Sequence, residues 1–170
     1  MDAAPFARID ASRLTLDVGR IKGKSVYRNK TFEEFSIADI AYLTDVVSQK
    51  LKFEIAPSVI NLTEISRPGA TPHIDRFNVA LNYYVAASGL DETTFWETQA
   101  DIKYRYGVSN GFNEAGLTPL SIRLFAKQDD FVLLNTRIIH SVKVSENRLI
   151  LRFCWIGYSF KQVFDSISVI

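Results

Sequence analysis

From residue 58 onward, the chain is a succession of short apolar runs separated by turn residues, and this pattern constrains the fold most. The runs are 59–62, 77–85, 93–96, 122–125, 131–134, 138–144 and 148–158. Runs of this length that are rich in β-branched and aromatic side chains predict strands. Strands so closely spaced, with no long helical stretches between them, are typical of an all-β sandwich or barrel rather than of βαβ units.

The chain before residue 58 is predicted to hold one strand-like region and one helix. Residues 12–28 alternate apolar and polar side chains around Gly23. Residues 38–52 carry apolar side chains near the helical period, and Ser36 can cap their start. We expect this helix to pack across a sheet. The segment 160–170 fits a short helix or an edge strand, and the sequence does not choose between them.

Composition excludes several classes of partner. The net charge is +1, so no basic surface indicates nucleic acid. No apolar run approaches the roughly twenty residues of a membrane span, and the first residues lack the apolar stretch of a signal peptide. Cys154 is the only cysteine, which excludes a disulfide framework. We therefore expect a single domain over residues 1–170, cytoplasmic, with no nucleic-acid or membrane partner.

The chain holds only two histidines, and one of them stands two residues before an aspartate. His73 and Asp75 have the same parity, so on a strand both side chains lie on one face. His140 closes a separate apolar run, and only the fold can bring it to that pair. Two imidazoles and one carboxylate on one side of an ion suit Fe(II) and leave the opposite positions open. A single His-x-Asp is also common by chance, and a strand histidine is more often a core or surface group than a ligand.

The order of motifs along the chain resembles that of the Fe(II)/2-oxoglutarate-dependent dioxygenases. The segment 71–75 (TPHID) is similar to the family's first metal-binding strand, and 139–142 (IHSV) to the strand with its second histidine. Similar segments are 81–85 (LNYYV), 92–95 (ETTF), 128–134 (QDDFVLL) and 148–151 (RLIL). The resemblance covers about residues 58–158. It implies a mainly β fold, a double-stranded β-helix (jelly roll), with one or two packing helices.

The sequence departs from the family's pattern at three places. Leu90-Asp91 stands where the family has hairpin glycines, and Asp129 where it has a glycine before an aspartate. Ile150 replaces the serine of the Arg-x-Ser found in some branches, so one hydroxyl contact to the co-substrate is missing.

The resemblance implies that an arginine after His140 binds the far carboxylate of 2-oxoglutarate. An arginine fork matches a carboxylate and stays charged. Arg148 and Arg152 share a strand face, so either can serve, and the spacing from His140 favours Arg148. Further candidates for co-substrate contacts are Asn82, Tyr84 and Thr93. The alternative for each is structural, a surface salt bridge for the arginines and a satisfied core group for the others.

We therefore expect an Fe(II)- and 2-oxoglutarate-dependent oxygenase, a hydroxylase, with His73, Asp75 and His140 as its catalytic metal ligands. Ascorbate is a further candidate cofactor. By resemblance, the Asp75 carboxylate fills the position that halogenases leave to chloride, which favours hydroxylation. The substrate, a small molecule or a peptidyl residue, is not readable, although the segment 99–118 is where a substrate loop would lie.

Two other classes of protein stay open. One is a cupin-type jelly-roll module that binds a metal or a ligand without keto-acid chemistry. The other is a cupin isomerase or dioxygenase that uses its metal without a keto acid. A buried arginine that faces the metal distinguishes the oxygenase from a binding module.

Overall fold

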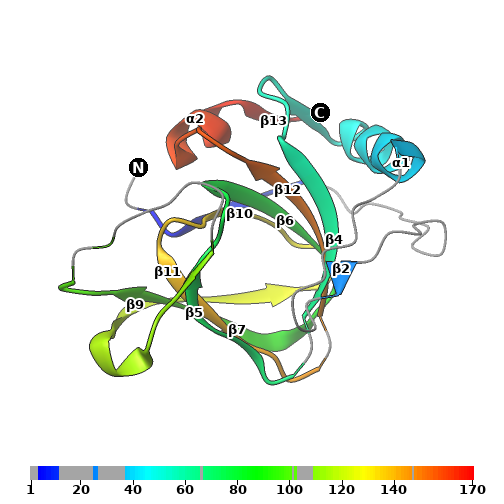
Figure 1. Ribbon diagram of the computed structural model, residues 1–170. Coiled ribbons are helices and arrows are strands. Elements are labelled where there is room, and N and C mark those ends of the chain that lie inside the picture. Colours follow the sequence, from blue (N-terminus) through cyan, green and yellow to red (C-terminus); the bar gives the residue numbers. More distant parts are fainter. Residues whose placement is uncertain are drawn as a thin grey trace.

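The protein is mainly β, as the spacing of its apolar runs predicts (Figure 1). The computed structural model describes residues 4–11, 25–26, 37–65, 67–100, 102, 109–146 and 148–170. The strand-like region predicted at 12–28 falls outside these residues apart from 25–26, and so does the Ser36 cap.

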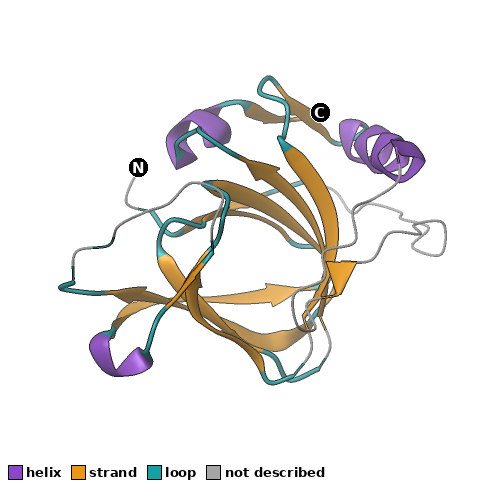
Figure 2. Cartoon of the chain, in the orientation of Figure 1, coloured by secondary structure: helices purple, strands orange, loops and turns teal. Residues whose placement is uncertain are grey.

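Two sheets contain most of the described strands (Figure 2). The six-stranded sheet has the order β1 (Phe6–Ile9), β10 (Phe131–Asn135), β6 (Val79–Ala86), β12 (Arg148–Trp155), β4 (Val59–Ile65), β2 (Ser25–Val26). The five-stranded sheet has the order β8 (Asn110–Gly111), β5 (Gly69–Ile74), β11 (Ile139–Lys143), β7 (Ser88–Glu97), β9 (Thr118–Lys127). Among the described strands, β2 and β4 pair in parallel and the other pairs are antiparallel. Each of the seven predicted runs lies largely or wholly within a strand.

The predicted helix is present, but it is shorter than expected. Helix α1 spans Ile37–Ser48, whereas the prediction ran to residue 52. Residues Leu51–Phe53 instead form β3, which pairs with β13 (Ile167–Val169) at the other end of the chain. The prediction extended the helix too far because Leu51 continues the helical spacing of apolar residues. Leu51 is fully buried in the same cluster as Leu43 and Val47 of α1. The segment 160–170 contains both expected forms, a helix α2 (Phe160–Asp165) and then β13.

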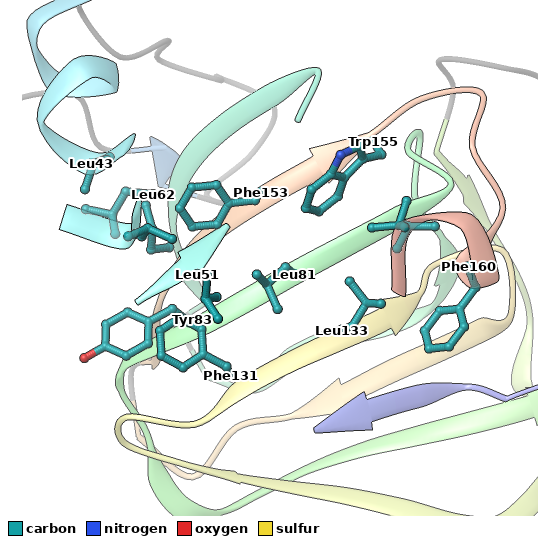
Figure 3. Close-up of a cluster of buried hydrophobic side chains, with 14 residues drawn as sticks. Leu43, Leu51, Leu62, Leu81, Tyr83, Phe131, Leu133, Phe153, Trp155 and Phe160 are labelled. Atoms are coloured by element: carbon teal, nitrogen blue, oxygen red, sulfur yellow. The ribbon is translucent and has the colours of Figure 1, made fainter. Parts of the chain in front are cut away.

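The helices cover the outer face of the six-stranded sheet. Figure 3 shows the cluster of apolar side chains that they bury against β6, β10 and β12. Its members include Leu43, Leu51, Leu81, Tyr83, Phe131, Leu133, Phe153, Trp155 and Phe160. None of the helices among the described residues is long and apolar enough to cross a membrane.

The opposite face of the same sheet belongs to a second cluster. Tyr84, Phe95 and Ile150 are buried there, and they come from strands of both large sheets. Because side chains alternate along a strand, Asn82 shares the face of Tyr84, and Arg148 and Arg152 share that of Ile150. The predicted co-substrate residues of β6 and β12 therefore lie on the inner face, turned away from the helices.

Candidate metal centre

The fold brings the three predicted metal ligands together. His73 lies on β5 and His140 on β11, and the two residues are direct partners in the register of these strands. Asp75 follows β5 immediately, and its backbone N–H donates to the carbonyl of Thr136 at 3.2 Å. The ligand atoms of the two histidines and the aspartate all lie within 4.8 Å of one another. A ligand set that the sequence could only suggest is thus a single cluster.

The two imidazoles are oriented by the backbone. Nδ1 of His73 lies 2.7 Å from the carbonyl oxygen of Thr71, and Nδ1 of His140 lies 3.0 Å from that of Ile138. Since a carbonyl only accepts, each Nδ1 carries the proton, and in the neutral ring Nε2 keeps its lone pair. This is the tautomer that a metal-binding histidine needs.

The Nε2 atoms of both histidines face the carboxylate of Asp75. Nε2 of His73 is 3.3 Å from Oδ1 of Asp75, and Nε2 of His140 is 3.9 Å from Oδ2. The two rings are 4.5 Å apart between centroids. Acceptor atoms this close repel unless a proton or a cation lies between them. Two nitrogens and one carboxylate oxygen suit a borderline divalent ion such as Fe(II) better than calcium or magnesium, so the residues present fit the expected metal.

The protonation states of Asp75 and His140 at neutral pH suit metal ligands. Burial raises the pKa of Asp75, but the charge of Arg152 and the hydrogen bond with His73 outweigh it and hold the pKa well below its usual range. Burial, reinforced by repulsion from His73, lowers the pKa of His140 to about 4. Burial also lowers the pKa of His73, but the neighbouring Asp75 outweighs it and the pKa is raised. Asp75 is therefore ionised and His140 neutral at pH 7.

Arg152 contacts the carboxylate of the His73–Asp75–His140 group and not an empty anion site. Its Nη2 donates to Oδ2 of Asp75 at 2.5 Å, and its Nε donates to the amide oxygen of Asn82 at 3.2 Å. The amide nitrogen of Asn82 lies 3.5 Å from the hydroxyl of Tyr84. Of the two candidate arginines, this one, which the spacing from His140 did not favour, already has an anionic partner.

Arg148 differs from Arg152, because its guanidinium is buried and two of its N–H groups have no acceptor among the described residues. The residue is 2% exposed, and its Nε and Nη1 have no hydrogen-bond partner among the described residues. Its guanidinium lies over the ring of Tyr84, 5.1 Å from the centroid. The buried hydroxyl of Thr93, another predicted co-substrate residue, also lacks a partner within the described ranges. Unsatisfied buried donors are rare and costly, so these atoms indicate a missing acceptor.

Sequence reasoning missed Asp91. It is fully buried, and its Oδ1 accepts three hydrogen bonds, from the hydroxyl of Ser88 and from the backbone and hydroxyl of Ser145. Burial raises its pKa, but these bonds and the charge of Arg148 outweigh it and lower the pKa. The other oxygen, Oδ2, has no partner in the described part of the chain. Asp91 lies two residues before Thr93 on β7 (Ser88–Glu97), so the two side chains share a strand face. This spacing could have identified Asp91 from the sequence as a neighbour of Thr93.

The described part of segment 99–118, the expected substrate loop, lies beside β5, the strand that contains His73. Strand β8 pairs with β5 so that Gly111 is opposite His73. The hydroxyl of Ser109 donates to the carbonyl of Ile74 at 2.9 Å, and the N–H of Phe112 to that of Pro72 at 2.8 Å. Tyr104 and Tyr106 of this segment lie outside the described residues.

Comparison of the chain with protein-family models, with curated proteins and with solved structures finds no match.

Proposed function

We propose that the protein is an Fe(II)- and 2-oxoglutarate-dependent oxygenase that hydroxylates a small-molecule or peptidyl substrate. The observation that carries the proposal is Arg148, a buried arginine with two unpaired donors on the inner face that also carries Arg152, the partner of Asp75. A metal site alone would not require such a residue. A dicarboxylate that binds the metal at one end needs a cationic partner at the other.

The strand order supports a double-stranded β-helix. Strands β4, β6, β10 and β12 lie in one sheet and β5, β7, β9 and β11 in the other. Along the chain, successive strands of this set change sheets at every step but β7 to β9. Two sheets of four strands with such crossings are typical of a jelly roll, and this supports the proposed fold.

Each group then has a definite task. His73, Asp75 and His140 hold the ion on one side and leave its other positions open. Arg148 binds the distal carboxylate through Nε and Nη1, and the hydroxyl of Thr93 supplies another donor. The bound Fe(II) and 2-oxoglutarate would supply the oxidation, in which O2 and 2-oxoglutarate yield succinate and CO2 while the substrate gains a hydroxyl group.

One observation favours a second candidate, the cupin-type module that binds a metal or ligand without keto-acid chemistry. The buried carboxylate of Asp91 lies close enough to Arg148 for the charge of the arginine to lower its pKa. Asp91 thus gives Arg148 an internal counter-charge, which makes an external carboxylate less necessary.

The test is the substitution Arg148→Met. Anaerobic protein loaded with Fe(II) is titrated with 2-oxoglutarate, and succinate release is measured after O2 is admitted. Charge-assisted hydrogen bonds contribute about 1.5–3 kcal/mol each, so we expect 2-oxoglutarate affinity to fall at least about 10-fold. Iron uptake should be nearly unchanged, because the three ligands stay.

The control is Arg8→Met, which removes an arginine that pairs with Asp130 on the surface. It should bind 2-oxoglutarate like the wild type. Equal affinity in Arg148→Met and the wild type would contradict the proposed anchor. Wild-type protein that takes up Fe(II) but neither binds 2-oxoglutarate nor releases succinate would favour the binding module.

A further inference from the structure

Arg152 donates a hydrogen bond to one of the two carboxylate oxygens of Asp75. Its Nη2 lies 2.5 Å from Oδ2 of Asp75, while the histidine His73 is close to the other oxygen, Oδ1. We propose that Arg152 is a positioning residue that reserves Oδ1 of Asp75 for the metal and keeps Oδ2 out of its coordination. The inference rests on the proposed metal centre and adds to it the device that limits the carboxylate to one bond.

The guanidinium is itself held in place from its other side. Arg152 and Asn82 are direct partners across β12 and β6, and Nε of Arg152 donates to the Asn82 amide oxygen at 3.2 Å. The Arg152 side chain is largely buried, with 17% of its surface exposed, and that of Asp75 with 12%. A planar fork fixed at Nε can present Nη2 in one direction only. The orientation of Asp75 is thus set by two strands of the six-stranded sheet, although Asp75 itself follows a strand of the other sheet.

The effect of this arrangement is on the number of open positions. A carboxylate with both oxygens free can bind an ion through one of them or through both. Binding through both would fill a position that the co-substrate or O2 needs. With Oδ2 held by Arg152, the three ligands occupy three positions and the remaining ones stay available.

The charge of Arg152 acts in the opposite direction on affinity, because a cation next to the site repels an incoming metal ion. Removal of hydrogen-bond partners of metal ligands nevertheless lowers metal affinity or activity, by about 10–100-fold. We expect the loss of orientation to outweigh the loss of repulsion, since Asp75 without Arg152 can turn away from the two histidines.

The experiment is a titration with Co(II), followed by its visible absorption, which reports both affinity and coordination number without any turnover. Arg152→Met should weaken Co(II) binding by about 10–100-fold and change the band intensities. Arg152→Lys, which keeps one charged donor, should restore part of both. Asn82→Ala leaves the ion pair in place but releases Nε, and it should weaken binding less, in the same direction.

The matched control is Arg123→Met, which removes an arginine paired with Glu92 at 2.8 Å on another strand. It should bind Co(II) like the wild type, and thermal unfolding checks that all variants fold. An Arg152→Met protein with unchanged affinity and spectrum, or with tighter binding, overturns the inference while the metal centre stands. If Arg152→Met does not fold, unchanged binding and spectrum in Asn82→Ala overturn it instead. Wild-type protein that takes up no Co(II) overturns the metal centre and this inference together.

Discussion

Asp75 is the residue at which both predicted histidines and Arg152 meet, so its removal has two separate consequences. In Asp75→Ala the ion loses its one anionic ligand, and we expect Fe(II) uptake and 2-oxoglutarate turnover to be abolished even with iron in excess. Arg152 is then a buried charge without its carboxylate partner. Stranding a buried charge costs about 3–5 kcal/mol of unfolding free energy, which urea unfolding measures.

The double variant Asp75→Ala/Arg152→Met separates these consequences. It should regain most of the lost stability, because no buried charge is left unpaired, and it should still bind no iron. If the double variant were as unstable as Asp75→Ala, the ion pair would not be the source of the loss.

The sequence predicted more about the ligands than about the residues around them. His73 and Asp75 could be paired by parity, and His140 was the one other histidine. Spacing from His140 favoured Arg148 as the anchor, but the sequence could not predict that Arg152 pairs with Asp75, because the two arginines share a strand face. That contact depends on the pairing of β12 with β6, which no local pattern contains.

At the scale of elements, Gly69 fixes the pairing that places His73 opposite His140. It opens β5 with φ +113°, and a Cβ at this position would lie 1.9 Å from the carbonyl oxygen of Val142 on β11. Gly69→Ala must therefore push β5 away from β11. We expect a loss of unfolding free energy of about 1–3 kcal/mol and weaker metal binding, because the two histidines move apart.

Gly111 provides the comparison for Gly69. It lies opposite His73 on the other edge of β5, and a Cβ there would meet nothing within 4 Å. Gly111→Ala should change stability by no more than about 0.5 kcal/mol. Metal titration and urea unfolding of both variants check the expectation, and equal behaviour of the two would refute the role assigned to Gly69.

Strands were easier to predict than their partners or their ends. The unbroken apolar run in 131–134 and the aromatic-rich run in 77–85 reflect burial on both faces, which a single sequence shows. The end of α1 was wrong because burial of Leu51 looks the same in a helix and in a strand, and its partner Val169 lies at the far end of the chain. The pairing of β1 with β10 was not predicted either, because these two strands also lie far apart in the sequence.

At the scale of the whole molecule, the apolar cluster under the helices and the proposed site lie on opposite sides of the six-stranded sheet. The helices and their large apolar cluster cover the outer face, whereas Asn82, Arg148 and Arg152 lie on the inner face. The residues His73, Asp91 and His140 come from the five-stranded sheet. The apolar cluster thus offsets the cost of burying Arg148, Arg152 and Asp91. Natural proteins accept such locally unfavourable groups at functional sites, and their cost is met elsewhere in the fold.

The buried histidine makes the stability of the metal-free protein depend on pH. Burial lowers the pKa of His140 from 6.5 to about 4, so between these values the unfolded chain binds a proton that the folded protein does not. Stability must then fall as the pH falls through this window. The raised pKa of His73 opposes this trend, and the lowered pKa values of Asp75 and Asp91 act only below the usual range of an aspartate.

The contribution of His140 is found by comparing the wild type with His140→Gln, both with chelator present. Between pH 7 and pH 5 a shift of this size corresponds to about 2 kcal/mol. We therefore expect the wild type to lose more unfolding free energy over this interval than His140→Gln does, by about that amount. Urea unfolding at both pH values measures the difference. Parallel losses in the two proteins would mean that burial does not lower the pKa of His140 in the folded protein.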